Sequence, residues 1–393
     1  MRTLVISDLH LGARPENDVL RRPEPRAALL EALASSDRLV LLGDTVELRH
    51  GPVHAALAAA TPVLAELGAA LGAGGEVVLV PGNHDHHLLE PWVTRRGTRP
   101  DAEPLGLETA VDWAAGEPLA VLAAALEPAQ VRAAYPGLWL SEDVYAIHGH
   151  YSDRHNLVPI LERLGAGLMA RVVGEPRPGP RAVGDYEGAL APMYALIDAV
   201  VRRRPPQLEA GEETFQVRTW RRLHATGRRA QLRAAGFKAL FAGAVGALNA
   251  AGLGPLRADV SGPALRRGGL YGMTEVAERL NIPARHVIFG HTHRAGPLPA
   301  DQRAEWLTPS GKELLNTGCW LWERSFVGDA PRASPYRPGF CVLLEDGGPP
   351  RLVNLLDREP ARERLGEAAN EPAPPRGLGE ARGEADRVAV DPG

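Results

Sequence analysis

Hydrophobic and polar positions divide the first part of the chain into short apolar runs and longer stretches of mixed character. Four apolar runs have the length and composition of buried strands, and they lie at residues 4–6, 39–42, 77–80 and 144–147. Two Ala- and Leu-rich stretches, residues 25–34 and 53–71, separate the first three runs and are typical of helices. This alternation predicts an α/β fold in which helices cover a sheet.

The pattern changes in the middle of the chain. Between residues 151 and 285 strand-like runs nearly disappear, and apolar residues recur at helical spacing, as at Met193, Leu196, Ile197 and Val200. Strand-like runs then return at residues 286–289, 313–316, 340–344 and 351–355. We therefore expect a core in two parts, residues 1–150 and 286–357, with an α-helical cap inserted at 151–285.

Composition and net charge restrict the expected domain organisation and the classes of binding partner. The segment 358–393 is rich in Glu, Arg, Ala, Pro and Gly without apolar periodicity, so we expect a disordered tail. The 393 residues are 45% apolar and 23% charged, which fits one large domain with an insertion, or two domains. A net charge of −4 argues against a nucleic-acid-binding surface over the whole chain.

The two cysteines and the N-terminal residues indicate the cellular compartment in which the protein is expected. Cys319 and Cys341 can form at most one disulfide, and their setting does not suggest a thiolate metal site. The N-terminal residues enter a strand directly and leave no room for a signal peptide. We therefore expect a cytoplasmic protein.

Polar residues that can bind metals follow five of the predicted strands. They form the motifs Asp8-Leu9-His10, Gly43-Asp44, Gly82-Asn83-His84-Asp85, His148-Gly149-His150 and Gly290-His291-Thr292-His293. Loops at strand ends build the active sites of α/β folds, so we expect these side chains to gather in one place. Oxygen and imidazole ligands without thiolate suit Mn, Fe or Zn better than Ca or Mg.

Each motif alone also has a simpler structural interpretation. Asp8 can be a turn or cap acid, and Asp44 can be a helix N-cap. His86 and His87, which follow the third motif, are typical of a helix face. The third motif is the most specific, because structure rarely requires an amide, an imidazole and a carboxylate in a row. Together the five motifs predict a dinuclear metal centre.

The ordered motifs resemble those of the calcineurin-like metallophosphoesterase family, whose pattern is DxH, GD, GNH(D/E), a His beside Gly, and GHxH. The resemblance covers residues 1–150 and 286–357. It implies a four-layer α/β/β/α sandwich, with two sheets packed together and the metals at one edge. It also implies two divalent metal ions, with Mn favoured over Fe and Zn.

Carried over position by position, the resemblance implies two ligand sets that share one carboxylate. One ion would be bound by Asp8, His10, Asp44 and His293. The other would be bound by Asp44, Asn83, His148 and His291. His150 is the alternative fourth-motif ligand, and otherwise it faces substrate.

The predicted reaction is hydrolysis of a phosphate ester or pyrophosphate. Two divalent ions would lower the pKa of a bridging water and orient the hydroxide for in-line attack on phosphorus. His84 is the candidate general acid, and Asp85 is the candidate residue that orients its imidazole. Arg14 is a candidate contact for a substrate phosphate, although a surface arginine is an equally good interpretation.

The charge of the predicted cap indicates what kind of substrate it could bind. Thirteen Lys or Arg and only four acidic residues lie between Arg202 and Arg267. This excess favours a phosphorylated small-molecule or lipid-linked substrate, peripheral contact with an anionic membrane, or nucleic acid; solvated helix faces are the simpler explanation. Only 5% of residues are aromatic, which does not favour a nuclease. The uncharged stretch 239–256 is only mildly apolar, so a packed helix is expected rather than a membrane span.

Gly43-Asp44-Thr45-Val46-Glu47, with a helical insertion before the last motif, is similar to the branch that contains UDP-2,3-diacylglucosamine pyrophosphohydrolases. His84 departs from that branch, in which Arg is typical at this position. The alternatives are therefore a UDP-linked lipid pyrophosphohydrolase at the membrane surface, a nuclease, and a non-catalytic scaffold. The complete ligand set favours an enzyme over a scaffold.

Overall fold

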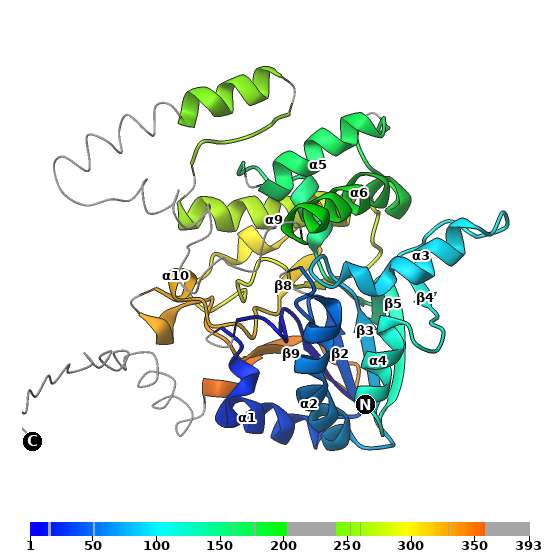
Figure 1. Cartoon of the computed structure of the whole chain (residues 1–393). Helices are drawn as coiled ribbons and strands as arrows, with labels where there is room; N and C mark the ends of the chain where they lie inside the picture. The colour runs from blue at the N-terminus through cyan, green and yellow to red at the C-terminus, as the bar shows by residue number, and fades with distance from the viewer. Residues whose placement is uncertain are drawn as a thin grey trace, which may run out of the picture.

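A computed structural model of the chain describes residues 1–14, 17–49, 52–159, 161–176, 178–202, 241–251, 253–259, 261–328 and 330–357. The predicted tail, 358–393, lies outside the described residues. So does the stretch 203–240, which contains nine of the thirteen basic residues between Arg202 and Arg267. The two predicted core segments and the helices between them are shown in Figure 1.

Ten strands form one hydrogen-bonded sheet in the order β10-β9-β1-β2-β3-β5-β6-β7-β8, with β4 beside β5. They are β1 (Arg2–Ile6), β2 (Arg38–Leu42), β3 (Glu76–Val80), β4 (Glu108–Val111), β5 (Gln130–Ser141), β6 (Val144–Ile147), β7 (His286–Phe289), β8 (Glu313–Asn316), β9 (Phe340–Glu345) and β10 (Arg351–Asn354). The eight strands expected from apolar runs are confirmed, whereas β4 and β5 carry no clear pattern of their own.

The long strand β5 divides this sheet into two halves. Its first residues pair with β3 and β4, and the residues from Gly137 onward pair with β6. Strands β1, β2, β3 and β5 are parallel in one half, and β6, β7 and β8 are parallel in the other. One buried cluster combines Val5, Val40 and Val78 from the first half with Ala146 and Ile288 from the second. The halves therefore face each other, as the predicted sandwich requires, although they are continuous rather than two separate sheets.

Helices cover the two outer faces of this sandwich (Figure 1). The first half is covered by α1 (Pro23–Leu33), α2 (Val53–Leu71), α3 (Glu90–Gly97) and α4 (Pro118–Ala125). The second half is covered by α5 (Leu161–Val172), α6 (Val183–Arg202) and α9 (Gly262–Arg279). Shorter helices are η1 (Val19–Arg21), η2 (His86–Leu89), η3 (His150–Arg154), η4 (Arg303–Trp306), α10 (Arg324–Val327), η5 (Pro331–Ala333) and η6 (Leu355–Asp357).

Strand residues alternate between the two layers of core. In β1, Leu4 and Ile6 pack beneath the helices of the first half, while Val5 points into the layer between the half-sheets. This period of two is the expected alternation of side chains along a strand. Both faces of the strand are buried, which explains why its sequence is a continuous apolar run rather than an alternating one.

The described part of residues 151–285 is helical, and the boundaries of the predicted domains remain predictions. Among the described helices, α2 alone is long and apolar enough to cross a membrane by length and composition. Its Leu64 and Leu67 are buried in the core of the first half, which accounts for this apolar character. Within the described part of the uncharged stretch 239–256 lies a shorter apolar helix, Phe241–Ala250, in which Val245 is buried.

Candidate metal centre

The five motifs come together at one end of the sandwich. They follow β1, β2 and β3 in one half-sheet and β6 and β7 in the other, and each begins within two residues of the end of its strand. Within each half these strands are parallel, so their carboxyl ends lie at the same edge. Because the halves face each other, the two edges meet and bring the motif loops into contact.

The backbone at these loops has an uncommon conformation. Seven non-glycine residues among those described have positive φ, and five of them are predicted metal ligands: Asp8 at 54°, His10 at 47°, Asp44 at 52°, His291 at 65° and His293 at 58°. A side chain in this region costs on the order of 1–3 kcal/mol per residue. Strain of this kind persists where the surroundings fix it, and its concentration here marks the loops as a functional site.

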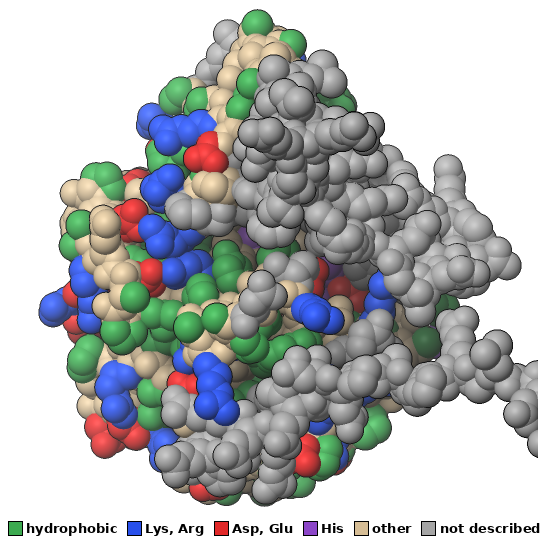
Figure 2. Space-filling view, turned by 90° about the vertical axis from the view of Figure 1, so that its left-hand side faces the viewer, with side chains coloured by type: hydrophobic (Ala, Val, Ile, Leu, Met, Phe, Trp, Pro, Cys, Tyr) green, Lys and Arg blue, Asp and Glu red, His purple; other side chains and the backbone are tan. Residues whose placement is uncertain are grey.

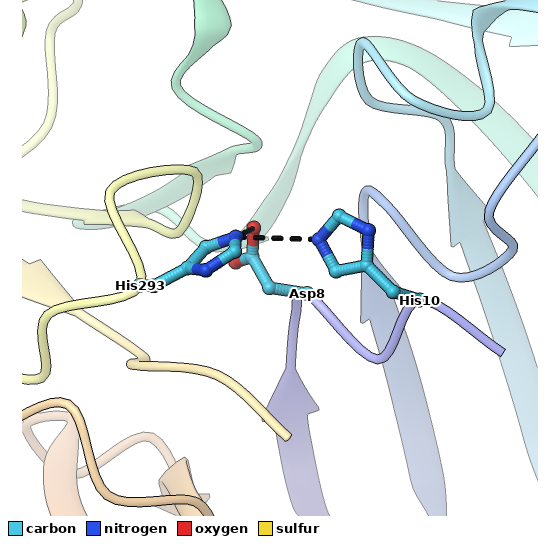
Figure 3. Close-up of side chains that lie close together, drawn as sticks. All are labelled: Asp8, His10 and His293. Carbon is cyan, nitrogen blue, oxygen red and sulfur yellow. Dashed lines mark hydrogen bonds and ion pairs between the residues drawn. The ribbon is translucent and has the colours of Figure 1, made fainter. Parts of the chain in front are cut away.

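The first group of donor atoms consists of Asp8, His10 and His293, whose candidate ligand atoms all lie within 4.8 Å of one another. His293 Nε2 is 3.3 Å from Asp8 Oδ1 and 3.2 Å from His10 Nε2 (Figure 3). Asp8 Oδ2 accepts the backbone N–H of His291 at 2.9 Å, which leaves Oδ1 directed toward the two imidazoles. One carboxylate oxygen and two imidazole nitrogens thus converge, as a transition-metal ion requires.

The second group consists of Asp44, His148 and His291, again with ligand atoms within 4.8 Å of one another. Asn83 joins it, because its Oδ1 is 3.1 Å from both His148 Nε2 and His291 Nδ1. Asp44 Oδ2 lies 3.3 Å from His148 Nε2 and 3.7 Å from His10 Nε2. The carboxylate of Asp44 therefore stands between the two groups, where a bridging ligand belongs.

The geometry separates the two candidate histidines of the fourth motif. His148 Nε2 faces Asp44 and Asn83, while His148 Nδ1 lies 2.9 Å from the carbonyl oxygen of Leu42. His150 is also fully buried, but its Nε2 lies 3.2 Å from the Tyr135 hydroxyl, and it belongs to neither donor group. The structure thus brings His148, and not His150, into the cluster.

Electrostatics at the cluster favour positive charge. Burial alone would lower the pKa of His10, but Glu47, Asp44 and Asp8 outweigh it and raise this pKa to about 9. Burial is likewise outweighed at His148, where Asp44 and Asp8 raise the pKa to about 10. A carboxylate field strong enough to hold protons on two buried imidazoles would also attract a divalent cation in their place. The donor set and its charge therefore fit the implied metals.

The surroundings of His84 differ from the prediction in one respect. Glu47, not Asp85, contacts the His84 imidazole, with Oε2 2.8 Å from Nδ1. The Asp85 carboxylate instead accepts backbone N–H groups, from Thr45 at 2.7 Å and from Gly82 at 2.6 Å. Asp85 ties two motif loops together, and its predicted role of orienting His84 is wrong for this structure.

Glu47 also contacts a predicted metal ligand, His10. Its Oε2 also lies 3.1 Å from His10 Nδ1, so one carboxylate oxygen serves both a predicted ligand and the predicted general acid. Such outer carboxylates fix the tautomer and the orientation of metal-binding imidazoles. The spacing Asp44-Thr45-Val46-Glu47 was the available signal, but the sequence equally allowed a first-turn helix acid.

Arg49 is a candidate functional residue that the sequence analysis missed. Its side chain is buried, Nη1 lies 3.4 Å from His84 Nε2, and the guanidinium lies over the ring of Tyr194 at 5.2 Å from the centroid. Tyr194 belongs to α6, so a helix of the predicted cap reaches the site. Arg14, the arginine that was singled out, is exposed.

Two motif glycines permit the close packing of these groups. A Cβ on Gly43 would overlap the His148 imidazole, and the φ of this glycine is +85°. A Cβ on Gly290 would overlap Ser7 Oγ and Asp8 Oδ2. Glycine is thus required at both positions by the side chains of other motifs.

Residues 1–172 match the family model described as calcineurin-like phosphoesterase. Over these residues the chain is similar to that family. A search of the curated proteins finds no match to the chain. The family hydrolyses phosphoesters with the help of metal ions, typically two, and acts on phosphorylated substrates. The match contains the first four motifs; the fifth lies beyond it in sequence, and the fold brings His291 and His293 to the other four.

Proposed function

We propose that this calcineurin-like phosphoesterase uses a dinuclear metal centre to hydrolyse a phosphate ester or a pyrophosphate. The observation that carries the proposal is the position of Asp44 Oδ2, between a donor group of Asp8, His10 and His293 and a donor group of Asn83, His148 and His291. A carboxylate has lone pairs on both oxygens and can be shared by two cations.

The two ions would be held by the ligand sets that the sequence predicted, with Mn favoured. When bound, such ions would supply Lewis-acid chemistry, because they would make water more acidic and would offset negative charge on a phosphoryl group. The protein's contribution is to fix the ligands. Glu47 fixes the ring of His10, and the carbonyl oxygen of Leu42 fixes the ring of His148.

Arg49 and His84 supply the remaining chemistry. Arg49 has a planar guanidinium beside His84 and is suited to donate two hydrogen bonds to phosphoryl oxygens. Burial, aided by the charge of Arg49, lowers the pKa of His84 to about 4 despite the nearby Glu47. A phosphoryl anion at this position would raise that pKa again, since an opposite charge favours the protonated imidazole. His84 would then donate a proton to the leaving oxygen, with Glu47 supporting the imidazolium.

The substrate class is proposed more broadly. Basic, acidic and apolar side chains are mixed over one face of the molecule (Figure 2), and Arg266 is paired with Glu305 at 2.7 Å. This mixture supports a phosphorylated small molecule or a lipid-linked pyrophosphate such as a UDP-linked lipid, with peripheral membrane contact, over nucleic acid. We propose a cytoplasmic location because Cys319 and Cys341 are buried free thiols, which suits a reducing compartment.

The experiment is a substrate screen with the full-length protein and added Mn. It compares p-nitrophenyl phosphate, bis-p-nitrophenyl phosphate and UDP-linked pyrophosphates, with and without a chelator. We expect Mn-dependent turnover of at least one class, strong loss in Asp44→Asn, and strong loss in His84→Ala with bound metal nearly unchanged. Equal activity of wild type and Asp44→Asn would refute the dinuclear mechanism, and two bound ions without turnover of any class would favour the scaffold.

A further inference from the structure

The short helix η3, directly after the fourth motif, brings a carboxylate to a predicted metal ligand of the fifth motif. Asp153 Oδ1 lies 2.8 Å from His291 Nε2, and Asp153 is buried, with 1% of its surface exposed. We propose that Asp153 is a positioning residue for the ion bound by Asp44, Asn83, His148 and His291. This inference rests on the proposed dinuclear function and names a residue outside the five motifs.

The chemistry of imidazole links this contact to metal binding. A metal-ligating imidazole gives one nitrogen lone pair to the ion and keeps an N–H on the other nitrogen. Donation of the Nε2–H of His291 to Asp153 leaves Nδ1 as the ligand atom, and Nδ1 is the atom that lies 3.1 Å from Asn83 Oδ1. An Nδ1 lone pair and an amide oxygen cannot bond to each other, so a cation between them satisfies both.

Among the described residues, the hydrogen bond to His291 is the contact that accounts for a buried carboxylate at position 153. Its Oδ2 is buried and has no hydrogen-bond partner among the residues that the structure describes. Burying a carboxylate is costly unless its charge is compensated. His291 is the polar partner of Oδ1, so the carboxylate has its function there.

Two of the other predicted imidazole ligands, His10 and His148, show the same arrangement. His10 is held through Nδ1 by Glu47, and His148 is held through Nδ1 by the carbonyl oxygen of Leu42. In each case an acceptor behind the ring directs the opposite nitrogen into the cluster. Asp153 provides the corresponding acceptor for His291.

The position of Asp153 is fixed by the helices of the predicted cap. Helix η3 packs against α9, where the carbonyl oxygen of Ser152 approaches Gly272 so closely that a Cβ on this glycine would overlap it. The insertion thereby places one carboxylate behind a metal ligand.

The test measures Mn binding by the metal-free full-length protein, by calorimetry and by metal analysis after equilibrium dialysis. In Asp153→Ala we expect one of the two ions to bind about 10–100-fold more weakly, the usual effect of removing an outer partner of a ligand, and the other to bind as in wild type. Asp153→Asn, which keeps an acceptor oxygen, should lose less.

Glu175→Gln is the matched control, because it changes a buried acid of the same region that does not contact a ligand. The thermal stability of both variants is measured, so that a general loss of stability can be distinguished from a loss of Mn binding. The Mn affinity of Glu175→Gln should equal that of wild type. Wild-type affinity for both ions in Asp153→Ala, or an equal loss in Glu175→Gln, overturns the proposal. Wild-type protein that binds fewer than two ions would instead overturn the dinuclear function itself.

Discussion

Glu47→Gln tests how far the site depends on one carboxylate outside the ligand set. Glu47 Oε2 lies 3.1 Å from His10 Nδ1 and 2.8 Å from His84 Nδ1, and its Oε1 accepts the backbone N–H of Arg49 at 2.9 Å. Glutamine keeps the size of the side chain but has one acceptor oxygen and no charge. It can accept from both imidazoles only if its NH₂ group faces the N–H of Arg49, so at least one charge-assisted hydrogen bond is lost.

The expected loss of activity follows from the number of hydrogen bonds that Glu47→Gln removes. A hydrogen bond to a charged group contributes about 1.5–3 kcal/mol, and each 1.4 kcal/mol corresponds to a factor of about ten. We therefore expect Glu47→Gln to lower kcat/KM by roughly 10–150-fold. The part of this loss that acts through His10 should be recovered at high Mn concentration, because His10 is a predicted metal ligand. The part that acts through His84, the predicted general acid, should remain.

The assay is kcat and KM on the substrate found in the screen, at low and at saturating Mn, for wild type, Glu47→Gln, His84→Ala and the double variant. If Glu47 acts through His84, the second substitution adds little in the His84→Ala background at saturating Mn, because residues that act as a unit are not additive. Glu66→Gln, at a surface ion pair with Arg26, is the control for the chemical change. Independent, multiplicative losses in the double variant would refute the reasoning.

Three further predictions concern other parts of the site. Asp44→Asn should weaken binding of both ions, since its Oδ2 faces both donor groups; Mn stoichiometry by metal analysis checks this, and loss of one ion only would contradict the bridge. Asp85→Asn should lower the free energy of unfolding by about 1–3 kcal/mol, because asparagine has one acceptor oxygen and cannot accept from both Thr45 and Gly82. Urea unfolding of the metal-free protein measures this change, and unchanged stability would argue against the loop-tying role. Gly290→Ala should reduce Mn binding through overlap with Ser7 and Asp8, whereas Gly188→Ala in α6, where a Cβ meets nothing within 4 Å, should bind Mn normally; dialysis with Mn compares the two.

The sequence predicted the strands and the ligands for a common reason. Runs such as residues 39–42 are buried on both faces, so they are continuous and apolar. A polar residue within two positions of the end of such a run, such as Asp44, is therefore conspicuous. The long strand β5 gave no such signal, because Tyr135, Pro136 and Gly137 interrupt its apolar pattern where it passes from one half-sheet to the other. The continuity of the sheet could therefore not be predicted.

The supporting residues were harder to predict than the ligands. Glu47, Arg49 and Asp153 act through side-chain contacts between elements that are distant in sequence, and His291 is 138 residues from its partner Asp153. Buried polar residues of this kind have no periodicity that marks them. Adjacency in the chain predicted Asp85 as the partner of His84, whereas in the structure the Asp85 carboxylate accepts the backbone N–H groups of Thr45 and Gly82.

The folding of one sheet into two facing halves has a consequence for how the protein assembles. Asp8, His10, Asp44 and Asn83 come from the first half, and the three remaining ligands come from the second. Each ion would therefore be a cross-link between the half-sheets, at the open end of a sandwich whose interior is a layer of apolar side chains. A chain whose halves have not yet closed on each other holds neither complete ligand set, so metal capture would mark the last step of folding and keep the closed sandwich closed.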